Sequence, residues 1–344
     1  MRFGSLPDGR DVHLLRLRHA SDVTLEVLEF GGIVRALRVP DRTGATADVV
    51  LGYDDLAGYL EDPWFVGGII GRYAGRIRAA RFALDGFEHA LDPNDGPHHL
   101  HGGAHGFHRR MWDIEPFASA SGVGVDLRLA DDDRGGYPGR LDVHVSYTLT
   151  PANEWVVDYE AATDADTVLN LTQHSYFNLS GTGGDAMAHR LMIHAEAFAA
   201  TDATLIPTGD LLHVAGTPLD FRGALPIGAR IDDPSLGAAR GYDHDFVLHR
   251  QGDGLASAAR VLEPRSGRTL EIRTTEPALH LYSGNFLDGT RFGKGGRRLG
   301  PRQGFCLETQ HLPDSPNHPH FPSTVLRPGE EFRSRTVFAF GTDR

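Results

Sequence analysis

The stretch Leu141-Asp-Val-His-Val-Ser-Tyr-Thr-Leu149 carries the periodicity on which the fold depends. Every second side chain is apolar, and the side chains between them are polar. This period of two is typical of a β-strand that buries one face and exposes the other. Shorter copies of the alternation occur at residues 23–27, 125–129 and 270–272, and residues 331–341 are expected to form a closing strand.

Turn signals separate these expected strands, and long helices are not expected. The sustained apolar spacing of a helix is missing, and residues 56–60 are only a short helical candidate. The turn signals are Pro7-Asp-Gly9, Arg134-Gly-Gly136, Ser180-Gly-Thr-Gly-Gly184 and Arg327-Pro-Gly329. Many short strands with dense turns predict an all-β fold, a large antiparallel β-sandwich with few short helices. Because no linker-like tract or internal repeat divides the chain, we expect a single domain over residues 1–344.

The charge of the chain excludes some classes of partner. It has 34 basic and 46 acidic residues, which gives a formal net charge of −12. Nucleic acids and anionic membrane surfaces are bound by clustered lysines and arginines, so we expect neither as a partner. The densest basic stretch, residues 291–302, is rich in glycine and is predicted to be a solvated loop.

Cysteine content and the N-terminus bear on the compartment. The one cysteine, Cys306, excludes an internal disulfide and gives no support for a secreted disulfide scaffold. The N-terminus lacks a charged segment followed by an apolar one, and no later segment approaches about 18 continuous apolar residues. We therefore expect a cytoplasmic protein.

Histidine is abundant, with 19 residues, and five of them are clustered. The cluster contains His98, His99, His101, His105 and His108. His99 and His101 could place two metal ligands on one strand face, although no carboxylate follows at a typical spacing. The alternative is that these imidazoles transfer protons or form hydrogen bonds with a polar ligand.

Two further segments carry candidate functional residues. In residues 168–181, taken as a strand, His174 lies on a polar and partly aromatic face that suits a groove for a hydroxyl-rich ligand, or an ordinary solvent face. In residues 304–310, Cys306, Glu308 and Gln310 share one face. Because its neighbours are apolar, Glu308 is a candidate for a desolvated base with a raised pKa, the alternative being a plain glutamate on an exposed strand.

Other catalytic patterns are missing. Residues 67–71 are rich in glycine, but neither the phosphate-loop nor the dinucleotide spacing follows. The sequence has no Gly-x-Ser-x-Gly elbow and no Cys/His nucleophile pattern, so covalent catalysis has no support.

Several short motifs occur in an order that resembles the aldose 1-epimerase, or galactose mutarotase, family nearly from end to end. Each motif is weak alone, but together and in order they are specific. The motifs are Val39-Pro-Asp-Arg-Thr-Gly44, Val49-Val-Leu-Gly-Tyr-Asp-Asp55, Gly71-Arg-Tyr-Ala-Gly-Arg-Ile77, Leu100-His-Gly-Gly103, His174-Ser-Tyr-Phe-Asn-Leu179, Gly241-Tyr-Asp-His-Asp245, Tyr282-Ser-Gly-Asn-Phe-Leu-Asp-Gly289, Phe305-Cys-Leu-Glu-Thr-Gln310, Pro313-Asp314 and Phe321-Pro-Ser-Thr-Val-Leu-Arg-Pro-Gly-Glu330.

The resemblance implies a sugar-binding groove on a β-sandwich, no cofactor and no metal. It also implies interconversion of the α and β anomers of a free aldose such as galactose or glucose, by a monomer or homodimer. By resemblance, Glu308 is the general base and His174 the general acid. The residues matching positions that hold sugar hydroxyls are Arg76, His101 and Asp243, with His280 at a position that is usually glutamine.

This chain departs from the family pattern at four places, which leaves the preferred sugar open. His280 replaces the usual glutamine, and Gly75 replaces an asparagine found in some relatives. His98 and His311 also stand where asparagine is common. The acid and the base are retained.

The chemistry of anomer exchange fits these residue types. A base removes the proton of the C1 hydroxyl while an acid protonates the ring oxygen, so that the ring opens and recloses on the other face. His174 would have to be protonated near neutrality, and we expect a nearby carboxylate, Asp243 or Glu308, to raise its pKa. The alternatives are a non-catalytic sugar-binding or sugar-sensing protein and a metal-dependent hydrolase or lyase built on the histidine cluster.

Overall fold

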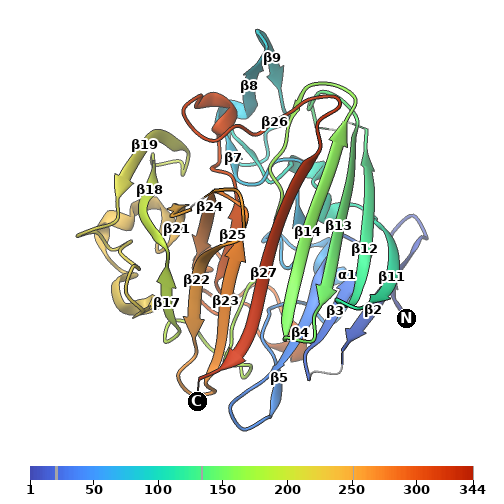
Figure 1. The fold of residues 1–344 in the computed structure, drawn as a ribbon, viewed down its shortest axis with the longest axis vertical. Helices are drawn as coiled ribbons and strands as arrows, with labels where there is room; N and C mark the ends of the chain where they lie inside the picture. The colour runs from blue at the N-terminus through green and yellow to red at the C-terminus, as the bar shows by residue number, and fades with distance from the viewer. Residues whose placement is uncertain (20–21, 133–134, 251, 344) are drawn as a thin grey trace.

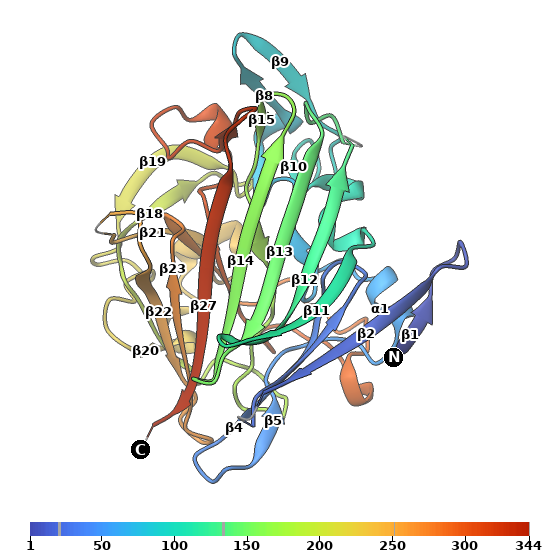
Figure 2. The same ribbon diagram turned by 45° about the vertical axis from the view of Figure 1, so that its right-hand side comes forward.

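The computed structural model describes residues 1–19, 22–132, 135–250 and 252–343, and within these ranges most of the regular secondary structure is antiparallel strand (Figure 1). The largest sheet contains, in spatial order, β11 (Asp113–Ser119), β12 (Gly122–Asp131), β13 (Leu141–Leu149), β14 (Glu154–Thr163), β27 (Phe332–Thr342), β23 (Arg268–Thr274), β22 (Ala256–Leu262), β17 (Arg190–Ile193) and β20 (Leu225–Pro226). Figure 2 shows its long central strands side by side.

Two smaller sheets and several two-stranded ladders complete the β structure. One sheet contains β1 (Arg2–Ser5), β2 (Asp11–Arg18), β3 (Thr24–Leu28), β4 (Val34–Pro40) and β5 (Thr46–Asp48). The other contains β19 (Pro207–His213), β18 (Ala195–Thr201), β21 (Asp243–Leu248), β24 (Ala278–Tyr282) and β25 (Cys306–Gln310). The ladders pair β7 (Arg76–Ile77) with β10 (His99–Leu100), β6 (Ile69–Ile70) with β16 (Thr172–Gln173), β15 (Thr167–Val168) with β26 (Val325–Leu326), and β8 (Arg81–Leu84) with β9 (Phe87–Ala90).

Helical structure is short, as the sequence predicts. The expected helix at residues 56–60 is α1 (Leu56–Leu60), whose N-cap Asp55 accepts a hydrogen bond from the N–H of Gly58. The 3₁₀ turns are η1 (Arg78–Ala80), η2 (Gly103–His105), η3 (Phe107–Arg109), η4 (Ile227–Arg230), η5 (Pro234–Ala239), η6 (Lys294–Gly296) and η7 (Ser315–Asn317). In the described part of the chain, no helix is long and apolar enough to cross a membrane.

The alternation in residues 141–149 has the predicted consequence. Strand β13 has the predicted bounds, and its apolar side chains are buried in one large core cluster. Leu279 of β24 and Leu307 of β25 belong to the same cluster, so the large sheet and the sheet that contains β24 pack their apolar faces together. The predicted all-β fold, an antiparallel β-sandwich with few short helices, is confirmed. That residues 1–344 form a single domain stays a prediction, and Arg134, in one predicted turn, lies outside the described residues.

The strand predicted over residues 168–181 is wrong. Only short pieces of this segment pair as β15 and β16, and the rest is irregular. Residues 168–179 are buried, and backbone bridges join Asn170 to Tyr73 and Phe177 to both Val50 and Phe305, so other chain segments lie beside this segment at several points. A segment enclosed on both sides keeps polar side chains buried, so its alternating pattern did not indicate a solvent face.

The basic loop at residues 291–302 is only partly exposed, with Gly293 and Leu299 buried. Arg297 and Arg298 are exposed, but the Nζ atom of Lys294 lies 2.6 Å from Oδ2 of Asp48 and donates to the carbonyl oxygens of Arg35 and Val50. This lysine therefore fastens the loop to β5.

Candidate active site

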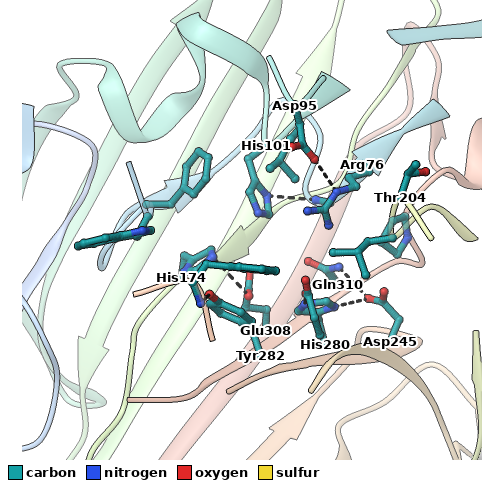
Figure 3. A pocket seen from close by; sticks show the side chains of 18 of the residues that line it. Arg76, Asp95, His101, His174, Thr204, Asp245, His280, Tyr282, Glu308 and Gln310 are labelled. Atoms are coloured by element: carbon teal, nitrogen blue, oxygen red, sulfur yellow. Dashed lines mark hydrogen bonds and ion pairs between the residues drawn. The ribbon is translucent and has the colours of Figure 1, made fainter. Parts of the chain in front are cut away.

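The predicted site residues converge on one cavity of about 390 Å³ (Figure 3), a volume typical of small-molecule sites. Trp64, Phe65, Tyr176, Tyr282 and Phe286 add aromatic surface to its lining. The six residues that the sequence singled out all line it: Arg76, His101, His174, Asp243, His280 and Glu308.

One side of the cavity is a row of polar side chains across three neighbouring strands. In the antiparallel register, His280 of β24 is opposite Asp245 of β21 on one side and opposite Glu308 of β25 on the other. Asp243 is opposite Tyr282, two residues further along. Because directly opposed residues project from the same face of a sheet, strand pairing alone brings these side chains together.

The other side is built from irregular chain held by backbone hydrogen bonds. His174 is fixed by its own N–H, which donates to the carbonyl of Gly68, and by its carbonyl, which accepts from the N–H of Gly67, both at 2.9 Å. His101 has a positive φ of 52°, and its Nδ1 accepts a hydrogen bond of 3.1 Å from the N–H of Gly75. A backbone N–H can only donate, so the neutral imidazole of His101 carries its proton on Nε2.

Gly75 itself is required by this geometry. Its φ is +77°, and a Cβ atom there would lie 2.6 Å from Cγ of Pro313. The asparagine of some relatives would not fit without displacing this proline. The next residue, Arg76, donates from Nε to Oδ2 of Asp95 at 2.7 Å, which orients the guanidinium beside the cavity.

Glu308 and His174, the predicted base and acid, lie next to each other in the cavity. Oε1 of Glu308 lies 3.6 Å from Nε2 of His174, and the residues are 2% and 4% exposed. Among the atoms described, Oε2 of Glu308 has no hydrogen-bond partner. Burial raises the pKa of Glu308 to about 8, against a weaker lowering by the charge of His280. The raised pKa expected for Glu308 is confirmed.

The raised pKa expected for His174 is wrong. Burial lowers the pKa of His174 to about 3, and the charge of Asp243 opposes this only weakly. Removal of the imidazolium from water therefore outweighs the attraction of the nearby carboxylate. Near neutrality, in the cavity without sugar, Glu308 holds the proton of the pair and His174 is neutral.

The donor atoms of His101, His174 and Glu308 lie within 4.8 Å of one another, a spacing compatible with a metal ion. However, the hydrogen bond from Gly75 places the proton of His101 on Nε2, the nitrogen left to face the cavity, whereas a ligating nitrogen must be deprotonated. Metal-binding histidines normally donate their second N–H to an acceptor, and His101 does the reverse.

His99, which the sequence offered with His101 as an alternative pair of metal ligands, does not line the cavity. Its Nδ1 lies 2.7 Å from the carbonyl oxygen of Asp92, and its Nε2 lies 2.8 Å from the hydroxyl of Tyr137. Because both ring nitrogens already have partners, this pair of histidines does not fit a metal centre.

The remaining clustered histidines and His311 have other surroundings. His105 is exposed, whereas burial lowers the pKa of His108 to about 3. Nδ1 of His98 accepts from the N–H of Ala79 at 3.1 Å, and Nδ1 of His311 lies 2.7 Å from Oε2 of Glu276. These four do not line the cavity.

His280 has a carboxylate at each ring nitrogen. Its Nε2 lies 2.8 Å from Oδ1 of Asp243, and its Nδ1 lies 3.0 Å from Oδ1 of Asp245. Although burial opposes the charge, the two aspartates raise the pKa of His280 well above its usual range, and in turn His280 helps to hold the pKa of Asp243 below its usual range against burial.

Asp245 was not predicted from the sequence as a site residue, and Gln310 was predicted only to share a strand face with Glu308. Nε2 of Gln310 donates to Oδ1 of Asp245 at 3.1 Å, behind His280. The sequence did contain a signal for both residues. Residues two apart in a strand share a face, and Asp245 and Gln310 each lie two positions from a predicted site residue, Asp243 or Glu308. That these faces meet depends on the strand order.

Comparison with known proteins agrees with this fold and shows the family. The family described as aldose 1-epimerase matches residues 13–339. The chain is 42% identical to the galactose mutarotase of Bos taurus over 339 residues, covering 98% of this chain and 97% of that protein. It is 38% identical to the aldose 1-epimerase of Escherichia coli K12 over 338 residues, covering 97% and 96%.

A solved structure shows the same relationship in three dimensions. The galactose 1-epimerase from Lactobacillus acidophilus NCFM superposes with a TM-score of 0.88 at 29% identity, covering 100% of this chain and 98% of that one. The match therefore extends over the whole length of both chains. This chain belongs to the aldose 1-epimerase family, whose members are isomerases also called mutarotases.

Proposed function

We propose that this protein interconverts the α and β anomers of a free aldose, such as galactose or glucose, by moving protons between the sugar, Glu308 and His174. The observation that carries the proposal is the contact of 3.6 Å between Oε1 of Glu308 and Nε2 of His174 inside a cavity of about 390 Å³. Their pKa values, about 8 and about 3, mean that the pair holds one proton over a wide range of pH.

One shared proton is what the reaction needs. The C1 hydroxyl must lose a proton while the ring oxygen gains one, so the site requires one acceptor and one donor at the same time. When the C1 hydroxyl of the sugar donates to Glu308, it stabilises the carboxylate and favours the proton on His174. Glu308 then takes the hydroxyl proton and His174 protonates the ring oxygen.

The open-chain aldehyde then exposes its other face by rotation about C1–C2. Ring closure reverses both transfers, so Glu308 returns a proton to the C1 oxygen and His174 removes the one it gave. The enzyme regains its starting protonation state without a cofactor. A well-placed acid or base typically contributes roughly 10²–10⁴-fold to the rate.

In this proposal, Arg76, His101 and Asp243 hold the sugar in place. Nε2–H of His101 and the guanidinium of Arg76 are donors for sugar oxygens, and the ionised carboxylate of Asp243 is an acceptor for a sugar hydroxyl. His280 lies beside Asp243 in the lining of the same cavity. Galactose is a reasonable first substrate, because it appears in the names of both the bovine and the Lactobacillus relatives.

The catalytic unit is one chain. Every residue named in this mechanism lines a cavity formed within a single chain, so a monomer or a homodimer with independent sites would function alike. A cytoplasmic setting, where free aldoses are metabolised, is part of the proposal and is compatible with the single unpaired cysteine, Cys306.

Polarimetry of freshly dissolved α-galactose and α-glucose tests the proposal. We expect the wild type to accelerate the decay of optical rotation, and Glu308→Gln to lower kcat by at least roughly 100-fold, because the amide cannot accept the proton. The matched control is Glu276→Gln, which alters a buried glutamate that contacts a histidine outside the cavity and should retain activity. A Glu308→Gln enzyme within a few-fold of the wild type would refute the role of the base.

A further inference from the structure

The unusual residue of the cavity is His280, which lies between two aspartates. Its side chain is 15% exposed, and the side chains of Asp243 and Asp245 are 8% and 4% exposed. The contacts measure 2.8 Å from Nε2 to Asp243 and 3.0 Å from Nδ1 to Asp245. Gln310 donates to the same oxygen of Asp245, which fixes that carboxylate behind the imidazole.

We propose that His280 is a permanently cationic positioning residue, which orients Asp243 toward the sugar and stabilises the carboxylate of Glu308 without binding the sugar itself. The proposal rests on the proposed function, because it concerns the same reaction. It assigns to Asp245 the role of keeping the imidazole charged.

The hydrogen-bonding capacity of the ring supports this assignment. A protonated imidazole has two N–H donors and no acceptor. Nε2 of His280 forms a hydrogen bond with Oδ1 of Asp243, and Nδ1 is buried beside Asp245, where a sugar cannot reach it, so no donor remains for a sugar hydroxyl. A glutamine amide at this position would offer the sugar both a donor and an acceptor. His280 offers neither, so Asp243 is the group that binds the sugar on this side of the cavity. A hydroxyl held here must therefore donate.

Charge balance supports it as well. Asp243, Asp245 and Glu308 place three carboxyl groups on the same face of adjacent strands, directly around His280. Carboxylates that share a buried site raise one another's pKa unless a cation lies among them. Of the described residues that line the cavity, only Arg76 and His280 supply such a cation.

The other titratable groups around the ring do not supply a competing charge. Burial lowers the pKa of His244, on the same strand as Asp243, to about 4, and lowers that of His101 well below its usual range. His174 is neutral near pH 7 for the same reason. The charge of His280 therefore acts mainly on the three carboxyl groups beside it.

Removal of the His280 cation should change the pKa of Glu308. The charge of His280 lowers the pKa of Glu308, whereas Asp243 and Asp245 raise it. With glutamine at position 280, the two aspartates would act on Glu308 without compensation. The alkaline limb of the pH profile, where the acid–base pair loses its shared proton, should then move to higher pH.

Three variants test the proposal: His280→Gln, Asp245→Asn and the double variant that carries both. For His280→Gln we expect the alkaline limb of kcat/KM to rise by about one pH unit and KM to rise about tenfold, since Asp243 loses its partner. The double variant replaces the charged pair with a neutral amide pair. It should bring the pH limb and KM back toward wild-type values, a rescue that a merely structural role would not produce.

The protonation state can be read without activity. The imidazole nitrogen NMR spectrum of the wild type should show both nitrogens of His280 protonated from about pH 6 to about pH 8, where a free histidine titrates. In Asp245→Asn, His280 should begin to titrate within this range. His311→Gln is the control, because this histidine contacts one carboxylate outside the cavity and its loss should leave the kinetic pH profile unchanged.

Two results would overturn the proposal. One is a neutral His280 in the wild-type spectrum at pH 7, and the other is a His280→Gln enzyme whose pH limb and KM match the wild type. Failure of the proposed function can be distinguished from failure of this proposal. An active Glu308→Gln enzyme would refute the role of Glu308 as the base, whereas the NMR signal of His280 would still report the charge of the imidazole.

Discussion

At the scale of single residues, burial controls the chemistry of the acid–base pair. It disfavours the charged form of Glu308 and of His174, and so moves their pKa values in opposite directions, to about 8 and about 3. The pair consequently carries one proton between these values. A sugar hydroxyl can then shift that proton across a contact of 3.6 Å instead of drawing it from solvent.

The buried carboxyl of Glu308 should also make stability depend on pH. Its folded-state pKa of about 8 lies above the ordinary value of 4.5, so its favourable contribution is complete below that ordinary value and is lost as the pH rises toward 8. Because glutamine does not ionise, the Glu308→Gln variant does not lose stability in this way as the pH rises. We therefore expect the variant to gain stability over the wild type by a few kcal/mol, roughly, at about pH 9 and by much less at about pH 5, measured by thermal denaturation.

Glu26 provides the control of opposite sign. Although burial raises its pKa, contacts with Arg16 and Arg35 lower it overall. The stabilising contribution of Glu26 is therefore present above the ordinary carboxyl pKa and is lost as the pH falls. Glu26→Gln should cost more stability at high pH than at low pH. Parallel pH curves for Glu308→Gln and the wild type would contradict the assigned pKa of Glu308.

At the scale of elements, the glycines of residues 71–77 and 100–103 allow two backbone segments to meet beneath the cavity. A Cβ atom on Gly102, where φ is +78°, would lie 1.9 Å from the carbonyl oxygen of Gly71. Gly75 approaches Pro313 in a similar way and supplies the N–H that fixes the tautomer of His101. These glycines determine where His101 and Arg76 lie.

Asparagine at position 75 tests this packing. Because φ is +77° and Pro313 occupies the space of a side chain, we expect Gly75→Asn to destabilise the protein by about 1 kcal/mol or more and to raise KM. Thermal denaturation and polarimetry measure the two effects. Addition of Pro313→Ala should recover part of the stability, and no loss in Gly75→Asn alone would show that the loop adapts freely.

At the scale of the whole molecule, the protein has a formal net charge of −12, whereas the aldose that its site is proposed to bind is neutral. An uncharged aldose experiences no long-range steering, and the polar groups that bind it act only at contact distance. The charge of the surface is therefore free to serve solubility.

The dependence of the rate on ionic strength tests whether the net charge of the protein affects substrate binding. For galactose, kcat/KM should change by less than about twofold between about 20 mM and about 500 mM salt, since no net charge on the sugar is screened. A uronic acid, which carries a carboxylate, should instead react faster as salt screens its repulsion from the acidic protein. Strong salt dependence with galactose would contradict this prediction.

The sequence by itself determined the alternating strands, the identity of the family and six of the residues that line the cavity. Alternation in residues 141–149 is a local property, because the side-chain period of a strand follows from its backbone geometry, and β13 has those bounds. Glu308 was a candidate on local grounds, because its apolar neighbours indicated desolvation, and the family resemblance supplied its role as the base. Motif order supplied the remaining candidates, all of which line the cavity.

Tertiary structure alone decided which charges meet and how they titrate. His280 faces Asp245 and Glu308 only because β24 lies between β21 and β25, a strand order that no local pattern encodes. The neutral state of His174 arises from burial within a segment that is enclosed on both sides, which overrode the expected effect of nearby carboxylates. Desolvation and cross-strand proximity depend on residues distant in sequence, so they are properties of the folded chain.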